Sequence, residues 1–215
     1  GIICISKSTE KDLYKFFPEI KKNKVKTIYI SASKNFYKIK NIKEKIDDPK
    51  INDLINKKII LYVGDRRRSY KNFYLAVDVV SSMTDFTLVS VGTNNINKHE
   101  KKIIHKKLKN KFVHFYGIDA INLNKLSFCL LYPSIYEGFG IPVLEALKAG
   151  CPVIGTNYSS IPEVCGDSAI LIDDIKKKKF INAVNLLKNK NFRDTIISKG
   201  FKQSKKFSWY SCYNE

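Results

Sequence analysis

The chain has 215 residues, which is enough for one large domain or for one domain with a fragment of a second. Hydrophobic residues make up 44% of the sequence and charged residues 27%, values close to globular averages that exclude a disordered chain. The 39 Lys and Arg exceed the 20 Asp and Glu, giving a formal net charge of +19. Such a charge suits a nucleic acid, a phosphate-bearing ligand or an anionic membrane surface. Because Lys, Asn, Ile, Phe and Tyr are abundant along the whole chain, we favour a compositional bias over a selected basic patch.

The cysteines and the apolar runs indicate in which cellular compartment the chain is found. The five cysteines are odd in number and form no Cys-x-x-Cys pair, which argues against a disulfide framework or a zinc site and favours a reducing compartment. No apolar run approaches the roughly 18 residues that a membrane-spanning helix needs. The first residues show no signal peptide, and the chain starts without Met in mid-strand, so we expect part of a longer protein. We expect a cytoplasmic location and leave contact with the inner face of a membrane open.

The first residues are predicted to form two short strands, at residues 2–6 and 25–30, around a helix that opens at residues 8–12. Residues 35–53 are polar, basic and poorly periodic, which predicts a linker or a loop. The last segment, residues 192–215, is predicted to be helical and basic, with an aromatic cluster that includes Trp209.

Between these ends, short apolar runs alternate with segments of helical periodicity. Near-continuous apolar runs are typical of strands buried on both faces. We expect such strands at residues 59–63, 86–91, 112–116, 128–132, 152–154 and 169–172. We expect helices at residues 73–80, 99–108, 142–148 and 180–187, and a short one opened by a capping box at residues 160–163. The alternation predicts an α/β fold, a Rossmann-like parallel sheet with helices on both faces.

The densest chemical signal is the segment 132–146, in which a strand ends and a glycine-rich turn leads into a helix. Ligands of open parallel sheets bind beyond the carboxyl ends of the strands. Gly138 and Gly140 would let backbone N–H groups approach a ligand, and the helix N-terminus favours an anion. Glu137 and Glu145 flank this turn and can accept hydrogen bonds from the hydroxyls of a sugar or ribose. The alternative is a simple turn with two solvated glutamates, but the strand–turn–helix context favours a site.

A second signal is the segment 62–72, which also follows a strand and precedes a helix. Arg66, Arg67 and Arg68 are three of the four arginines of the chain, and Lys71 follows them. Arginine offers a planar fork that matches phosphate oxygens, and lysine adds a point charge. The segment therefore suits a diphosphate, with a solvated basic loop as the alternative.

Together the two segments resemble the donor-binding domain of family 4 glycosyltransferases of the GT-B fold. Residues 137–145 resemble the family's E-x7-E motif in its E-G-F-G-I-P-x-x-E form. Residues 62–73 resemble the Y-V-G-x-R-x-x-Y-K-N-F variant of mannosyltransferase-like members. The family's following segments match in order at residues 151–154, 159–164, 166–172 and 207–209, and residues 5–18 resemble the end of the N-terminal domain.

The resemblance implies transfer of a sugar from a nucleotide-diphosphate donor, with retention at the anomeric carbon, to a saccharide or lipid-linked acceptor. GDP-mannose is the first candidate for the donor, from the motif variant alone. By the same resemblance, the catalytic residues would be Arg66 and Lys71, which hold the diphosphate and stabilise the leaving group, and Glu137, which positions the sugar. Glu145 would bind the ribose. The other donor-binding residues would be Gly64, Gly138, Phe139, Gly140 and Ile141.

The chain has no D-x-D triplet, and Arg66 and Lys71 could replace a cation, so we expect no metal and no cofactor other than the donor. Asp65 stands where many members have arginine, which leaves open which of the three arginines reaches phosphate. The segment 117–128, where a helix normally walls the nucleotide pocket, is shorter than expected. The three histidines, His114 among them, show no metal or triad spacing and are predicted to be solvated or in the core.

The resemblance also divides the chain. Residues 1–40 would be a remnant of the N-terminal acceptor domain with its linker, 41–190 the donor-binding domain, and 191–215 a C-terminal helix crossing back to the first domain. Because half of the catalytic cleft would be missing, we expect donor binding with little or no transfer by this chain alone. The alternatives are a non-catalytic basic binding module for nucleic acid and a degenerate remnant. An epimerase or a phosphorylase of the same fold is disfavoured by the E-x7-E segment, and we expect no nucleic-acid partner.

Overall fold

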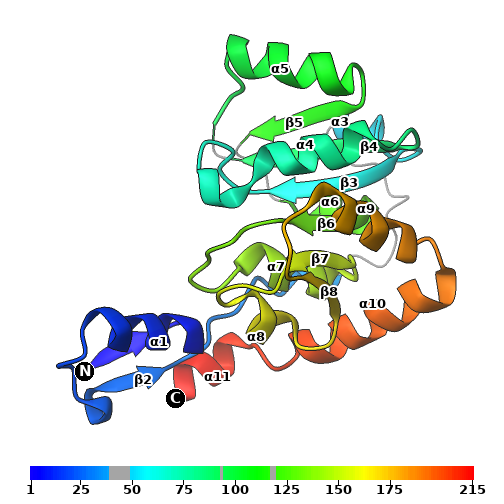
Figure 1. The fold of residues 1–215 in the computed structure, drawn as a ribbon. Helices are drawn as coiled ribbons and strands as arrows, with labels where there is room; N and C mark the ends of the chain where they lie inside the picture. Colours follow the sequence, from blue (N-terminus) through cyan, green and yellow to red (C-terminus); the bar gives the residue numbers. More distant parts are fainter. Residues whose placement is uncertain (39–48, 93, 117–119) are drawn as a thin grey trace.

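The computed structural model describes residues 1–38, 49–92, 94–116 and 120–215. Its main part is a six-stranded sheet with the strand order β5-β4-β3-β6-β7-β8, and every neighbouring pair is parallel (Figure 1). The strands are β3 (Lys58–Val63), β4 (Phe86–Gly92), β5 (Phe112–Tyr116), β6 (Ser127–Tyr132), β7 (Val153–Thr156) and β8 (Ala169–Ile172). All six strands predicted from the sequence are present, and the predicted α/β, Rossmann-like fold class is confirmed.

The strand order fixes where a ligand can bind. The chain runs from the central β3 outward to β4 and β5, then returns to the other side of β3 with β6. The loops that follow β3 and β6 therefore leave neighbouring strands in opposite directions, and the crevice between such loops is the usual ligand site of open α/β sheets. Both segments singled out in the sequence, 62–72 and 132–146, lie at this point.

Helices cover both faces of the sheet, because alternate side chains of each strand point to opposite faces. In β3, Ile60 and Tyr62 pack into one apolar core, and Ile59 and Leu61 into the other. The first core is closed by α4 (Phe73–Ser81), α5 (Lys98–Leu108) and α9 (Lys177–Leu186). The second is closed by α3 (Pro49–Asn52), α6 (Ile121–Leu126), α7 (Ile141–Ala149) and α8 (Ile161–Cys165). The long helix α10 (Lys190–Ser204) packs on α7 and α8.

The N-terminal residues form a small unit of their own. β1 (Ile2–Cys4) and β2 (Val25–Thr27) pair in parallel, with α1 (Lys7–Phe16) and the short 3-10 helix η1 (Lys22–Lys24) between them. The last helix, α11 (Trp209–Asn214), lies next to this unit (Figure 1). Both predicted strands were too long. The first ends early because the hydroxyl of Ser6 accepts from the Thr9 N–H and so starts α1 shortly after β1.

One carboxylate joins this unit to the main sheet. Glu163, on α8, accepts hydrogen bonds from the N–H groups of Lys7 and Ser8, at 2.9 and 3.0 Å. The Tyr29 hydroxyl donates to the same carboxylate at 3.1 Å. The first turn of α1 thus has two of its unpaired N–H groups satisfied by a residue far along the chain, in a position that also suits the helix dipole.

Two local predictions were wrong. Residues 35–53 are not only a loop: they contain α2 (Asn35–Lys38) and α3, and their apolar residues Phe36 and Ile51 are buried. The part of that prediction that covers residues 39–48 lies outside the described residues. Ser160 does precede α8, but its hydroxyl makes no cap there, because it donates to the Glu137 carbonyl instead. A capping box does form at α5, between Asn97 and Glu100.

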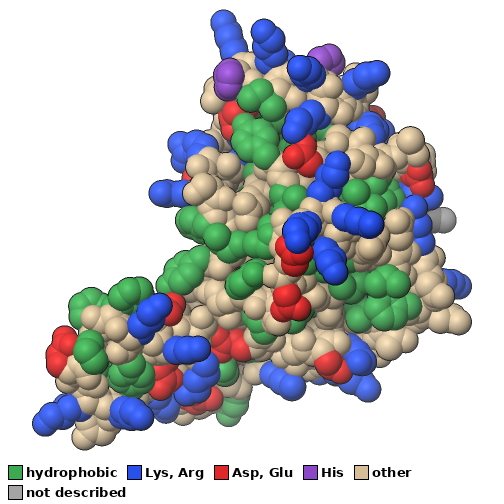
Figure 2. All heavy atoms as spheres, viewed as in Figure 1, with side chains coloured by type: hydrophobic (Ala, Val, Ile, Leu, Met, Phe, Trp, Pro, Cys, Tyr) green, Lys and Arg blue, Asp and Glu red, His purple; other side chains and the backbone are tan. Residues whose placement is uncertain are grey.

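The surface bears on the two interpretations of the net charge. Lys and Arg side chains are spread over the visible face rather than gathered over one element (Figure 2). This distribution favours a compositional bias. Of the helices in the described ranges, none is both long and apolar enough to cross a bilayer.

Candidate active site

The loops after β3 and β6 are tied together by hydrogen bonds. The loop after β3 contains the 3-10 helix η2 (Ser69–Lys71) and ends at Asn72, which has a left-handed backbone with φ +49°. Its side-chain amide donates to the Pro133 carbonyl at 2.9 Å. The Ile135 N–H donates to the Tyr70 carbonyl, also at 2.9 Å. These bonds hold the two predicted site segments side by side at the carboxyl edge of the sheet.

Lys71 and Glu137 meet across this junction. The Lys71 Nζ lies 2.5 Å from Glu137 Oε1, and the two side chains are only 15% and 11% exposed. Lys71 Nζ also donates to the Tyr132 hydroxyl at 3.4 Å. Burial, and after it the charge of Glu137, raises the pKa of the Tyr132 phenol well above its usual value, so this group stays neutral. Because burying an ion pair adds little net stability, the pair is a candidate for binding a ligand through its charges.

The glycine-rich turn lies directly after Glu137. Phe139 is 2% exposed and packs edge-on against Phe207, which anchors the turn in the core. Gly140 starts α7 with φ +95°, a conformation that glycine adopts without strain. In the described part of the chain, no acceptor is found for the N–H groups of Gly138, Phe139 or Gly140. Three successive N–H groups at the start of a nine-residue helix form a site for an anion or a polar oxygen.

The remaining predicted residues lie around this turn. Gly64 follows β3, and a Cβ placed there would lie 3.6 Å from Lys71 Cδ. Ile141 is the first residue of α7 and is 40% exposed. Glu145 lies further along α7 and is partly buried.

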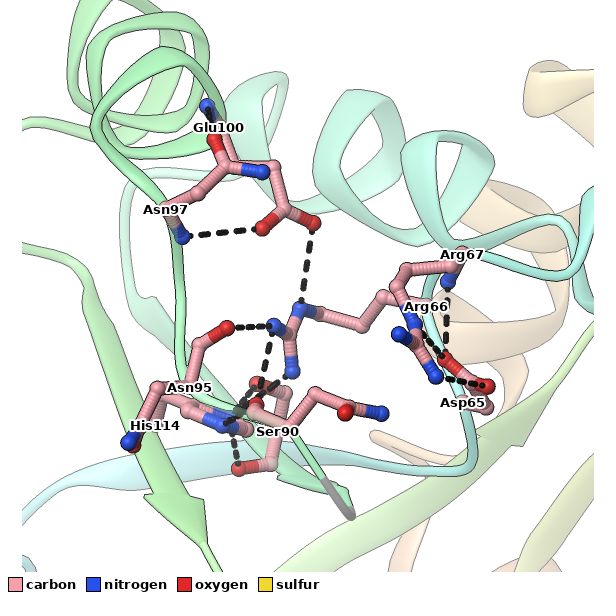
Figure 3. Close-up of polar contacts among 9 residues, drawn as sticks. Asp65, Arg66, Arg67, Ser90, Asn95, Asn97, Glu100 and His114 are labelled. Atoms are coloured by element: carbon pink, nitrogen blue, oxygen red, sulfur yellow. Dashed lines mark hydrogen bonds and ion pairs between the residues drawn. The ribbon is translucent and has the colours of Figure 1, made fainter.

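Arg66 is placed differently from Lys71 (Figure 3). Its side chain is 2% exposed and points to the segment after β4 and to His114 of β5. Its Nη2 donates to the carbonyls of Asn94 and Asn95, at 3.1 and 3.2 Å. Its Nη1 lies 3.1 Å from His114 Nε2, and its Nε lies 3.6 Å from a carboxylate oxygen of Glu100. The structure therefore brings Lys71 and Glu137 together but does not bring Arg66 to them.

His114 takes part in a cluster of contacts that its place in the sequence did not predict. It contacts Ser90 as well as Arg66, and it is half-buried in the middle of β5. Burial, followed by the charge of Arg66, lowers the pKa of its imidazole, so the neutral ring is favoured. The available signal was its place among the apolar residues of a strand, with its side chain on the face shared with Phe112.

The other two arginines remain at the surface. Their side chains, on Arg67 and Arg68, are 59% and 66% exposed, and both pair with Asp65. The hydrogen bonds from Arg67 lower the pKa of the Asp65 carboxyl to about 2. Asp65 thus neutralises part of the charge that the arginines would offer to a phosphate.

This fold and this junction of loops define a class of proteins, and the comparisons agree. The chain belongs to the family "Glycosyl transferases group 1", whose model matches residues 41–203. The predicted resemblance to family 4 glycosyltransferases of the GT-B fold is thereby confirmed. Among solved structures, Anabaena Alr3699/HepE in complex with UDP and glucose has a TM-score of 0.81 at 18% identity, over 99% of this chain and 60% of that one. At this identity the likeness concerns the fold.

Two curated relatives give the family more detail. The O-antigen chain mannosyltransferase B of Escherichia coli is 42% identical over 84 residues, or 38% of this chain and 22% of the relative. The uncharacterized glycosyltransferase MJ1178 of Methanocaldococcus jannaschii is 29% identical over 227 residues, covering 90% of this chain and 62% of the relative. The chain thus spans less than two thirds of the length of either relative.

Proposed function

We propose that the chain is the donor half of a retaining glycosyltransferase, which binds a nucleotide-diphosphate sugar for transfer to a saccharide or lipid-linked acceptor. The observation that carries this proposal is the buried contact between Lys71 and Glu137, next to the unpaired N–H groups of the 138–140 turn. A cation, a carboxylate and a set of N–H donors are the three kinds of group that a nucleotide sugar requires.

Each group has a task in the proposal. The Lys71 ammonium would bind the diphosphate and stabilise the negative charge that grows on it as the sugar leaves. Glu137, released from Lys71 by the incoming phosphate, would accept hydrogen bonds from the sugar hydroxyls. The N–H groups of the turn would donate hydrogen bonds to the sugar, the α7 dipole would add positive potential, and Glu145 would hold the ribose. No metal takes part in this scheme.

Arg66 would contribute in one of two ways. It would bind phosphate directly only after leaving the carbonyls of Asn94 and Asn95 and the carboxylate of Glu100. From its present position it would instead fix the ends of β4 and β5, which border the donor site. Its contacts favour the second role, because they already occupy most of its donors.

GDP-mannose is the first donor to test. The Y-V-G-x-R form of the segment after β3 supports it, as do relatives named mannosyltransferases. We expect little transfer by this chain alone, since proximity of donor and acceptor supplies much of the rate and the acceptor would bind elsewhere. A cytoplasmic location and contact with an anionic membrane surface remain predictions.

Calorimetric titration of the chain with GDP, UDP and ADP tests the proposal. One nucleotide should bind, and Lys71→Ala and Glu145→Ala should each weaken that binding. Lys190→Ala, at the start of α10, is the matched control and should bind like the parent chain. Failure of a folded chain to bind any of the three would contradict the proposal. Binding of an unrelated nucleic acid that weakens steeply with salt would favour a basic binding module instead.

A further inference from the structure

The backbone of Glu137 is held by two serines from the turn between β7 and α8. The Glu137 carbonyl oxygen accepts hydrogen bonds from Ser159 Oγ at 2.6 Å and from Ser160 Oγ at 2.9 Å. The Glu137 N–H donates to Ser159 Oγ at 3.1 Å. Side-chain hydroxyls thus satisfy both backbone polar groups of the residue that carries the site's carboxylate.

The next carbonyl is held in the same way from the other end of the chain. The Gly138 carbonyl oxygen accepts from Ser6 Oγ at 2.6 Å and from Thr9 Oγ1 at 3.1 Å. Ser6 also caps α1, so its one hydroxyl accepts from the Thr9 N–H and donates to Gly138. We call Ser6, Thr9, Ser159 and Ser160 the hydroxyl bracket.

The hydroxyl bracket fixes the orientation of the peptide groups in the turn at residues 137–140. With the carbonyls of Glu137 and Gly138 both directed at hydroxyls, the three N–H groups that follow have no acceptor within the described ranges. A run of N–H groups without acceptors is stable only where water or a ligand can reach it, since a buried N–H without a partner is costly. The bracket therefore keeps the donor groups of the turn available to a ligand.

The backbone of Ser159 shows that its hydroxyl matters. Ser159 has φ +55°, in the left-handed region that disfavours every residue with a Cβ. Glycine would adopt this conformation without strain, but glycine has no hydroxyl. The chain therefore tolerates a strained backbone at a position from which the side chain binds both backbone polar groups of Glu137.

We propose that the hydroxyl bracket is the positioning element of the donor site, and that Ser159 is its principal member. It fixes the Glu137 carboxylate and the N–H groups of the turn against the sugar moiety of the donor. This inference rests on the proposed function, in which Lys71 binds the diphosphate. Loss of the bracket should therefore weaken recognition of the sugar and leave recognition of the nucleotide diphosphate intact.

Hydrogen exchange of the ligand-free chain tests the first part. Ser159→Ala and Ser159→Gly both remove the hydroxyl, but the glycine variant also relieves the backbone strain and so should stay folded. Both should speed exchange of the Glu137 amide, whereas Ser82→Ala, which removes a hydroxyl bonded within α4, should not. Unchanged exchange of the Glu137 amide in both variants would overturn the proposal, whatever the chain binds.

Calorimetry with matched pairs of ligands tests the second part. The probes are GDP against GDP-mannose and UDP against UDP-glucose. In Ser159→Gly the Kd for the nucleotide sugar should rise roughly tenfold and the Kd for the nucleotide stay within about twofold, as the loss of one or two hydrogen bonds predicts. The double variant Ser6→Ala, Thr9→Val should likewise raise the Kd for the nucleotide sugar and leave the Kd for the nucleotide within about twofold.

The outcomes separate the two proposals. If Ser159→Gly weakens the binding of nucleotide and of nucleotide sugar equally, the positioning role is wrong and the substitution acts through a general effect on the fold. A parent chain that gains no affinity from the sugar would overturn it as well. If the parent chain binds no nucleotide at all, the proposed function fails. Faster exchange of the Glu137 amide in the Ser159 variants would then still show that the bracket holds the turn, and unchanged exchange would show that it does not.

Discussion

Lys71 and Arg66 follow the same strand, and the structure treats them in opposite ways. Both side chains are largely removed from solvent. Arg66 is surrounded by two carbonyls, an imidazole and a carboxylate, so several of its donors are already used by the protein. Lys71 faces one carboxylate that itself belongs to the predicted site. A basic residue in a motif is therefore available to a ligand only where the protein supplies few acceptors of its own, and that property cannot be read from residue type.

The largest expected effect is that of Lys71→Ala. Removing the ammonium leaves the Glu137 carboxylate buried without its partner, which typically costs about 3–5 kcal/mol. Urea denaturation measures the loss, and nucleotide binding should disappear with it. The double variant Lys71→Met, Glu137→Gln should recover most of the stability but no binding. Nucleotide affinity that survives in the double variant would show that the two side chains are structural only.

The next largest effect on stability is expected from Arg66→Ala. The change removes a buried cation together with the hydrogen bonds that it donates to the carbonyls of Asn94 and Asn95, at about 2 kcal/mol. Arg67→Ala is the matched control, and because its side chain is exposed, it should change the free energy of unfolding far less than Arg66→Ala. If Arg66→Ala reduces nucleotide affinity far more than stability, Arg66 binds phosphate directly and the structural role is wrong.

His114 should make part of the stability depend on pH. Its pKa is lowered in the folded state, so below about pH 6.5 the unfolded chain binds a proton that the folded chain resists. The contribution of His114 is therefore complete above pH 6.5 and is lost as the pH falls below it. Urea midpoints at pH 7.5 and pH 5.5 measure it. His114→Gln should flatten this dependence, and an unchanged slope would contradict the assignment.

The smallest effect should come from Asp65. Its pKa is lowered to about 2 in the folded state, so its stabilising pair with Arg67 is complete above the ordinary carboxyl pKa and is lost as the pH falls from about 4 to about 2. Asp65→Asn should cost less than about 1 kcal/mol at pH 6, because Arg67 is exposed. The difference between the variant and the parent chain should shrink as the pH falls from about 4 to about 2, whereas a difference that does not shrink would implicate the Asp65 hydrogen bonds rather than its charge.

Much of this molecule follows from its sequence. The six strands were predictable because each is a short apolar run buried on both faces, and the Lys71–Glu137 junction followed from two loops that end neighbouring strands. The placement of Arg66 could not be predicted from the sequence, since it depends on carbonyls and a histidine that other strands bring close to it. The hydroxyl of Ser160 was assigned to its own helix for the same reason: local spacing shows a cap, and only the tertiary structure offers the Glu137 carbonyl.

The attachment of Glu163 to the first turn of α1 bears on the order in which the chain folds. The N–H groups of Lys7 and Ser8 find their acceptor 156 and 155 residues later in the chain. Helix α1 precedes α8 in the chain, so its first turn is completed only after α8 has been made and folded. The residues of α1 thus depend on a much later segment for their final contacts, and such non-local pairing forms slowly in folding.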